Sequence, residues 1–217
     1  MRIIDVKTPA GSGRITLALP ADAPRAVLLL GHGAGGGIEA LDLAALAAGL
    51  PGRGLAVARY EQPWRVAGKK VAPAPATLDV GWRPALDAVG AALPGVPLVV
   101  GGRSAGARVA CRCFGVPAVG VLALSFPLHP PGRPEKSRVD ELAGVPAPVL
   151  LISGDRDPFG SPDELRAAIA SGQAGPRTLR LVVGSTHSFR PRKPAGAPSV
   201  GDELVDAAAS FVLALLG

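Results

Sequence analysis

The feature that most constrains the fold is a series of short apolar runs, each bounded by glycine or proline. The runs are RITLAL, AVLLLG, GLAVARY, PLVVGG, GVLALSF, PVLLISG and LRLVVG. Most are continuously apolar rather than alternating, which is typical of strands buried on both faces of a parallel sheet. Segments with helical periodicity separate them. This order predicts an α/β fold, with a mostly parallel sheet and helices on both faces.

The connecting segments refine this picture. The predicted helices are EALDLAALAAG, GWRPALDAVGAAL, AGARVACRCF, PEKSRVDELAG, SPDELRAAIAS and GDELVDAAASFVLALL. Ser161, Pro162 and Glu164 form a capping box with proline at the first helical position, which fixes one helix start. A leading RIIDV, separated from RITLAL by the turn-rich TPAGSG, predicts an antiparallel hairpin. Residues 60–77 hold three prolines without clear periodicity and are predicted to be a long loop.

Size and composition limit the class of protein. At 217 residues, 48% of them hydrophobic, the chain suits one domain over residues 1–217 with a sizeable core. It has no apolar run of membrane-spanning length, so no membrane partner is expected. The N-terminal segment shows no signal-peptide pattern, and a cytoplasmic location is expected. Cys111 and Cys113 form a C-x-C pair inside a predicted helix, a spacing that favours packing over a disulfide framework or a metal site.

The charge balance is positive, with a net charge of +6 from 23 Lys and Arg against 17 Asp and Glu. The positive residues are scattered and match no nucleic-acid-binding pattern, so no nucleic-acid partner is expected. Two basic segments, at 59–70 and 189–193, are expected near one edge of the sheet. Either they form a solvated rim or they attract anionic substrates to a cleft. Their positive residues are Arg59, Arg65, Lys69, Lys70, Arg190, Arg192 and Lys193.

One serine lies in a recognisable turn. The segment LVVGGRSAGARVA places Gly102, Ser104 and Gly106 as G-x-S-x-G between a predicted strand and a predicted helix. In such a strained turn the serine Oγ projects above the sheet, and the glycines let the strand and the helix cross closely. The pattern alone is weak, because a glycine-rich turn with a capping serine has the same letters. Its context favours a nucleophile.

A serine nucleophile needs a histidine base and a carboxylate that orients the base. Of the three histidines, His187 follows the last predicted strand, and Asp155 and Asp157 follow the strand before it. The carboxyl ends of parallel strands meet at one edge of a sheet, where open α/β sheets bind ligands. The order Ser, Asp, His therefore predicts a catalytic triad at that edge.

These segments resemble a known family. The Ser104 turn, GDRDPFG and THSF look like the nucleophile, acid and histidine segments of the α/β-hydrolase superfamily, in its dienelactone-hydrolase-like branch. LSFPLHPPGRPEK followed by PVLLISGDRDPFGSPDEL is similar to small hydrolases related to the testis-expressed and NSL-complex-subunit hydrolase-like proteins. The resemblance runs from about residue 15 to the end. It implies the α/β-hydrolase fold, with a mostly parallel central sheet of about eight strands.

The resemblance also implies roles for single residues. The family's Gly-x-x-Asp-Pro segment begins here at Gly154, which assigns the triad acid to Asp157, beside Ser104 and His187. Dienelactone hydrolases use cysteine as their nucleophile, whereas this chain has serine. Their substrate is therefore not carried over.

The glycine-rich stretch AVLLLGHGAGGG has two interpretations. Its glycines fit G-x-G-x-x-G, the pattern that binds a dinucleotide pyrophosphate. That interpretation expects an acid at the end of the next strand, but LAVARYE ends its strand with Arg59, and Glu61 comes late. The resemblance instead makes GHGAGG the family's His-Gly-X loop. The backbone N–H groups of Ala34 and Ala105 would then form an oxyanion hole, with His32 supporting the loop.

Three more residues are predicted to contact substrate. His129 follows the LALSF strand and should overlook the same edge as a pocket wall. Arg103, in the variable position of the serine turn, is expected to form a salt bridge or lie at the pocket rim. Trp64 belongs to the basic segment at 59–70.

Together these observations predict a serine hydrolase of a small or soluble ester, without metal or organic cofactor. Only about 20 residues separate LALSF from PVLLISG, which leaves no room for a large lid. Acyl transfer to an acceptor other than water would use the same residues. The alternative from another class is a hydrolase fold that has lost activity and serves as a binding or scaffold protein. The sequence predicts no oligomeric state.

Overall fold

The computed structural model describes residues 1–172, 175–190 and 199–217, and it is built on one eight-stranded sheet. The strand order is β1-β2-β4-β3-β5-β6-β7-β8. The strands are β1 (Arg2–Thr8), β2 (Gly11–Ala18), β3 (Ala26–Gly31), β4 (Leu55–Glu61), β5 (Leu98–Arg103), β6 (Ala118–Leu124), β7 (Val149–Gly154) and β8 (Arg177–Val182). The first hairpin pairs antiparallel, β2 pairs antiparallel with β4, and the remaining pairs are parallel. The predicted mostly parallel sheet and the opening hairpin are confirmed.

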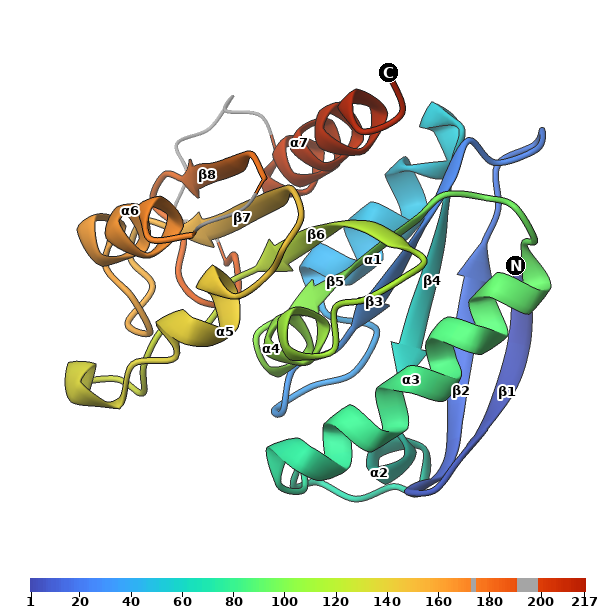
Figure 1. Cartoon of the computed structure of the whole chain (residues 1–217), viewed down its shortest axis with the longest axis horizontal. Helices are drawn as coiled ribbons and strands as arrows, with labels where there is room; N and C mark the ends of the chain where they lie inside the picture. The colour runs from blue at the N-terminus through green and yellow to red at the C-terminus, as the bar shows by residue number, and fades with distance from the viewer. Residues whose placement is uncertain (173–174, 191–198) are drawn as a thin grey trace.

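Helices cover both faces of this sheet. They are α1 (Leu41–Gly49), α2 (Pro63–Val66), α3 (Pro75–Ala92), α4 (Ala105–Arg112), α5 (Val139–Ala143), α6 (Pro162–Ala170) and α7 (Val200–Ala214), with two 3₁₀ turns at Pro51–Arg53 and Pro134–Lys136. The core cluster on one face includes residues of α3, α4, α5 and α6, and the cluster on the other includes residues of α1 and α7. Figure 1 shows α3 and α4 in front of the strands and α1 behind them.

Both core clusters draw on the same continuously apolar strands. In β3, which is buried along its whole length, Val27 and Leu29 belong to one cluster, whereas Leu28 and Leu30 belong to the other. Successive side chains of a strand point to opposite faces, so an apolar run serves both layers. This is the physical reason why the runs predicted the sheet so well.

Two predicted segments are corrected by the structure. The long loop at 60–77 is helical at both ends, since α2 begins at Pro63 and α3 at Pro75. Each of these prolines occupies the first helical position, where its missing N–H costs nothing. The helix predicted over 134–144 is broken at Ser137, which is extended, and its Oγ accepts a hydrogen bond from the Val139 N–H to start α5.

The connection between β6 and β7 decides how open the sheet edge is. It holds only the 3₁₀ turn at Pro134–Lys136 and the short helix α5. Within the described residues, no large lid covers the carboxyl ends of the strands, as the spacing predicts.

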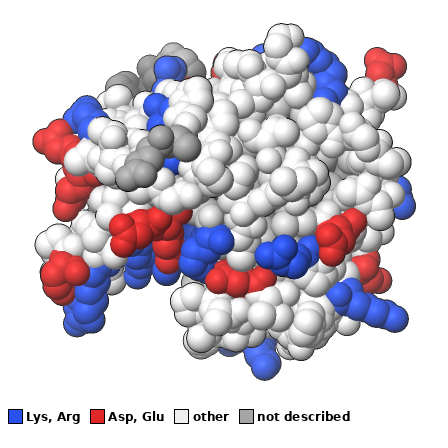
Figure 2. Space-filling model, viewed as in Figure 1, with Lys and Arg blue, Asp and Glu red and all other residues white. Residues whose placement is uncertain are grey.

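The surface seen in Figure 2 carries positive and negative side chains interleaved across the face of α3, α4 and α5. Paired charges account for part of this pattern. Arg112 binds Asp79 at 2.6 Å and Glu141 at 3.1 Å, and Arg108 binds Glu141 at 2.6 Å. This face therefore presents a mixed surface rather than a patch of one sign. Among the described residues, no helix is long and apolar enough to cross a membrane.

Candidate active site

Ser104 lies in a sharp turn between β5 and α4. Its φ of 52° and ψ of −113° belong to a backbone conformation that non-glycine residues rarely adopt. Such strain costs about 1–3 kcal/mol and persists only where surrounding structure holds it. The Ser104 N–H donates to the Leu124 carbonyl at 2.9 Å, which ties the turn to the end of β6. The turn thus presents the hydroxyl at the edge predicted from the sequence.

The two glycines that flank this turn allow a close crossing of backbones. Gly102 has a φ of 151°, and a Cβ there would lie against the backbone of Gly31. A Cβ on Gly106 would meet the same Gly31 and the His32 carbonyl oxygen, the latter at 2.9 Å. Glycine lets α4 pack directly on the end of β3, beside the loop that follows it.

His187 lies between Ser104 and an aspartate. Its Nε2 is 3.0 Å from Ser104 Oγ, and its Nδ1 is 2.8 Å from Asp157 Oδ2. With the proton on Nδ1, the imidazole donates to the carboxylate and accepts the serine proton. This is the arrangement by which a histidine activates a serine hydroxyl.

The two candidate acids have separate contacts. Asp157 is buried, and besides His187 its carboxylate accepts the Phe159 N–H at 2.9 Å and lies 3.3 Å from Ser153 Oγ. Asp155 Oδ1 instead accepts the Gly184 N–H at 2.7 Å, which pins the chain just after β8. The structure therefore brings Asp157, and not Asp155, against the histidine.

The loop after β3 is held by a neutral histidine. His32 Nδ1 lies 2.9 Å from the Gly33 carbonyl, and its Nε2 accepts the Gln62 N–H at 3.1 Å. Burial lowers the pKa of His32, which keeps the ring neutral with one donor and one acceptor nitrogen. These contacts agree with the predicted supporting role of His32.

Ala34 and Ala105 meet at one small void. They line it together with Gly33 and Trp64, and its volume of about 10 Å³ matches roughly one water-sized sphere. Within the described part of the chain, neither the Ala34 N–H nor the Ala105 N–H donates to a backbone acceptor. Two N–H groups without a backbone acceptor, on residues that line one void, are suited to binding a developing negative oxygen.

Arg103 and His129 both make contacts inside the protein. Arg103 reaches the His187 carbonyl at 3.0 Å and Asp42 Oδ2 at 3.1 Å, so the expected salt bridge is present. The His129 ring lies 2.8 Å from the Pro130 carbonyl and 3.2 Å from Glu164 Oε1. Both contacts raise the pKa of His129, and the contact with the Pro130 carbonyl has the larger effect. Substrate contact by Arg103 or His129 stays a prediction.

Two arginines of the basic segments have partners within the protein. The Arg59 guanidinium donates to the Ile38 carbonyl at 2.8 Å, and Arg65 lies 3.7 Å from Glu39. Three members are exposed, namely Lys69, Lys70 and Arg190. Arg192 and Lys193 lie outside the described residues.

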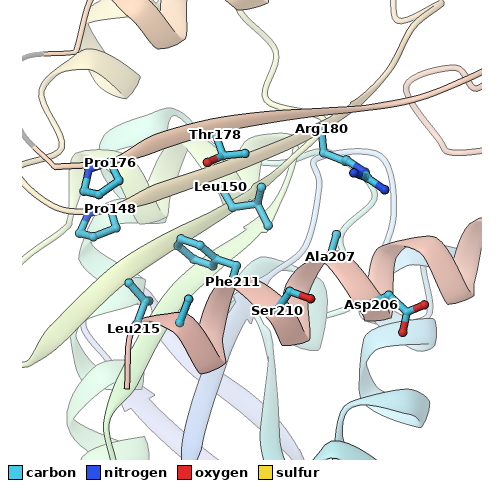
Figure 3. A pocket seen from close by; sticks show the side chains of 11 residues that line it. Pro148, Leu150, Pro176, Thr178, Arg180, Asp206, Ala207, Ser210, Phe211 and Leu215 are labelled. Atoms are coloured by element: carbon cyan, nitrogen blue, oxygen red, sulfur yellow. The ribbon is translucent and has the colours of Figure 1, made fainter. Parts of the chain in front are cut away.

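A separate groove of about 500 Å³ runs between α7 and the strands β7 and β8 (Figure 3). Pro148 and Pro176, which line it, precede β7 and β8, whereas Ser104 follows the carboxyl end of β5. Phe211 of α7 and Leu215, which directly follows α7, line its other side. The groove therefore lies at the opposite ends of the strands from Ser104.

The comparisons with known proteins agree with this geometry. A family model described as "Alpha/beta hydrolase domain" matches residues 24–215. The chain belongs to this family. No curated protein sequence matches it at a significant level.

Solved structures of other alpha/beta hydrolases share the fold at low identity. A serine hydrolase without a lid from Xanthomonas campestris is 21% identical, with a TM-score of 0.75 over 98% of this chain and 94% of that one. Est1E from Butyrivibrio proteoclasticus is 14% identical, with a TM-score of 0.79 over 100% and 99%. A dienelactone hydrolase from Anabaena variabilis is 18% identical, with a TM-score of 0.76 over 98% and 96%. These likenesses show that the chain shares their fold.

Two residues of this alpha/beta hydrolase site were not found from the sequence. Phe159 packs its ring on His187, with centroids 4.2 Å apart and planes tilted by 32°. Asp42 forms the buried end of the ion pair with Arg103. A lone acid in the apolar helix LDLAALAAG was a usable signal, because buried acids are rare unless they are paired.

Proposed function

We propose that this protein is a serine hydrolase that cleaves a small or soluble ester through an acyl-enzyme intermediate. The observation that carries the proposal is the unbroken contact from Asp157 through His187 to Ser104, with distances of 2.8 and 3.0 Å. The strained serine turn and the open sheet edge support it. In this proposal, residues 1–217 form one catalytic domain.

The mechanism follows from these contacts. Ser104 Oγ attacks the acyl carbon while His187 Nε2 takes its proton, and Asp157 stabilises the resulting imidazolium. The carbonyl oxygen becomes an oxyanion, which the N–H groups of Ala34 and Ala105 stabilise. His187 then protonates the leaving alcohol, which leaves Ser104 acylated. A water then attacks the acyl carbon and gives one proton to His187. The bond between the acyl carbon and Ser104 Oγ breaks, His187 returns the proton to Oγ, and the acid is released.

The proposal extends to the substrate. Trp64 lines the void at Ala34 and Ala105 and also a neighbouring hollow of about 350 Å³. We place the acyl group of the substrate beside the oxyanion-binding groups, where Trp64 limits its length. Arg103 and His129 are proposed as rim contacts of the substrate. Within the superfamily, we place the chain with the small hydrolases related to testis-expressed and NSL-complex-subunit proteins, on the segments that resemble them.

The test is active-site labelling with a fluorophosphonate probe. The wild-type protein should be labelled, and Ser104→Ala should lose labelling and the hydrolysis of short p-nitrophenyl esters, by about 10⁶-fold in kcat. Labelling that survives Ser104→Ala would reject Ser104 as the nucleophile. No labelling of a folded wild-type protein would favour a binding or scaffold role. Analysis of products with and without added alcohols separates hydrolysis from acyl transfer.

A further inference from the structure

Arg103 connects three segments that are far apart in the sequence. It lies at the end of β5, immediately before Ser104. One guanidinium nitrogen donates to the His187 carbonyl at 3.0 Å and to Ser188 Oγ at 3.1 Å. The Nε lies 3.1 Å from Asp42 Oδ2 in the first turn of α1. One side chain thus touches the nucleophile segment, the histidine segment and the helix after the glycine-rich loop.

The ion pair with Asp42 is shielded from water. The Asp42 side chain is 1% exposed and that of Arg103 is 12% exposed. The other carboxylate oxygen of Asp42 accepts the Leu43 N–H at 2.9 Å, which fixes it to α1. Burial raises the pKa of Asp42, and the Arg103 charge opposes this. Removing either partner of a buried pair leaves an uncompensated charge, so the two act as a unit.

The histidine segment needs such support. His187 lies beyond the end of β8 at Val182, outside the regular hydrogen bonds of the sheet. Its ring is positioned by Asp157 and Phe159, whereas its backbone carbonyl is held by Arg103. A misplacement of about 1 Å in a catalytic group costs about 100-fold in rate. A rigid guanidinium, which donates in a fixed plane, restrains the segment better than a flexible ammonium would.

We propose that Asp42 and Arg103 form a positioning pair that sets the approach of His187 to Ser104. The inference rests on the proposed function for its kinetic readout. It gives Arg103 a role besides the predicted substrate contact. The two roles differ in what a substitution changes: loss of positioning lowers kcat, whereas loss of a substrate contact raises KM.

The kinetic test compares Arg103→Met, Arg103→Lys and Asp42→Asn with the wild-type protein. We expect Arg103→Met and Asp42→Asn to lower kcat by about 100-fold, with KM changed less than about threefold. The effect should be equal for a neutral ester and for a matched ester with a free carboxylate. The kcat of Arg103→Lys should exceed that of Arg103→Met by less than about tenfold, because lysine restores the charge but not the planar set of donors.

Arg108→Met is the matched control. Arg108 belongs to α4 and forms a two-point ion pair with Glu141, with bonds of 2.8 and 2.6 Å, on the face of α5. Its loss removes an ion pair from α4, the helix that follows the Ser104 turn, so it controls for the loss of a charged contact close to that turn. We expect kcat of this variant to stay within about threefold of wild type, consistent with a partly exposed pair.

A spectroscopic readout makes the test independent of turnover. The Nδ1 proton shared by His187 and Asp157 should give a downfield proton resonance in the folded protein, abolished by His187→Gln. Arg103→Met and Asp42→Asn should shift or broaden this resonance, and Arg108→Met should leave it unchanged.

Unchanged kcat and an unchanged resonance in Arg103→Met would overturn the inference. A rise in KM for the anionic ester alone would also overturn it and assign Arg103 to substrate. A wild-type protein without labelling would reject the proposed function instead, while the resonance would still decide on positioning.

Discussion

Asp155 and Asp157 lie two residues apart but contact different partners, His187 in one case and the Gly184 N–H in the other. We expect Asp157→Asn to lower kcat by about 10⁴-fold, because an amide favours the wrong histidine tautomer. Asp155→Asn keeps an oxygen that can accept from Gly184 and should cost about tenfold or less. Steady-state kinetics of both variants measure the difference. The reverse ranking would move the orienting role to Asp155.

His32 predicts how stability depends on pH. Its pKa is lowered in the folded protein, so the unfolded chain binds a proton at higher pH than the folded one. Its contribution to the free energy of unfolding is complete above about pH 6.5, the unfolded pKa, and is lost as pH falls below that value, by at most about 1.4 kcal/mol per pH unit. Urea unfolding from pH 7.5 to 5 measures the total slope, to which His129, with its raised pKa, contributes in the opposite direction; the difference between wild type and His32→Gln isolates the contribution of His32. His32→Gln keeps an acceptor for Gln62 and should have a flatter slope; an equal slope would contradict the assignment.

At the residue scale, the sequence located the three members of the proposed triad because each follows a strand. That placement depends only on local order and on the direction of parallel strands. The partners of Asp42 and Phe159 depend on how distant segments pack: the apolar helix around Asp42 signals a buried, paired acid, but no local pattern identifies Arg103 or His187 as the partner. The structure brings Asp157 against His187 and Asp155 against Gly184, which agrees with the resemblance; the orienting role of Asp157 stays a prediction.

At the scale of elements, α2 places Trp64 between the small void at Ala34 and Ala105 and the neighbouring hollow of about 350 Å³. Its ring lies 5.4 Å from that of His32. We expect Trp64→Ala to join the small void to the neighbouring hollow, because the indole lines both. The ratio of kcat/KM for octanoyl over acetyl esters should rise by at least about tenfold. Trp64→Phe retains most of the volume and serves as the control. An unchanged acyl preference in Trp64→Ala would show that the acyl group binds elsewhere.

The helices also show where sequence patterns mislead. Pro63 and Pro75 indicate a loop at the level of sequence, yet each begins a helix, because proline disrupts a helix only beyond its first turn. The capping box at Ser161 was predicted correctly, because its two reciprocal hydrogen bonds involve residues three positions apart. Strand assignments were accurate for the buried strands, where apolarity is continuous.

For the whole molecule, the net charge of +6 bears on substrate choice. We expect an ester with a free carboxylate to have a higher kcat/KM than a neutral ester of equal size at about 10 mM salt, where the Debye length is about 30 Å. The advantage should vanish at about 1 M salt, where that length is about 3 Å. Arg65→Gln, which removes one rim charge, should reduce it. Equal rates at low salt would support a solvated rim, consistent with the Arg65–Glu39 contact.

The close backbone contacts around Ser104 determine which positions of this protein can accept substitutions during evolution. A methyl group on Gly102 or Gly106 would collide with main chain, which cannot move aside as a side chain can. Gly35 and Gly36, in the nearby loop, face open space. Random mutation followed by selection for activity should therefore recover many residues at the loop positions and only glycine at the other two. New specificities would arise through the loop and α2, while the turn that holds the nucleophile stays fixed.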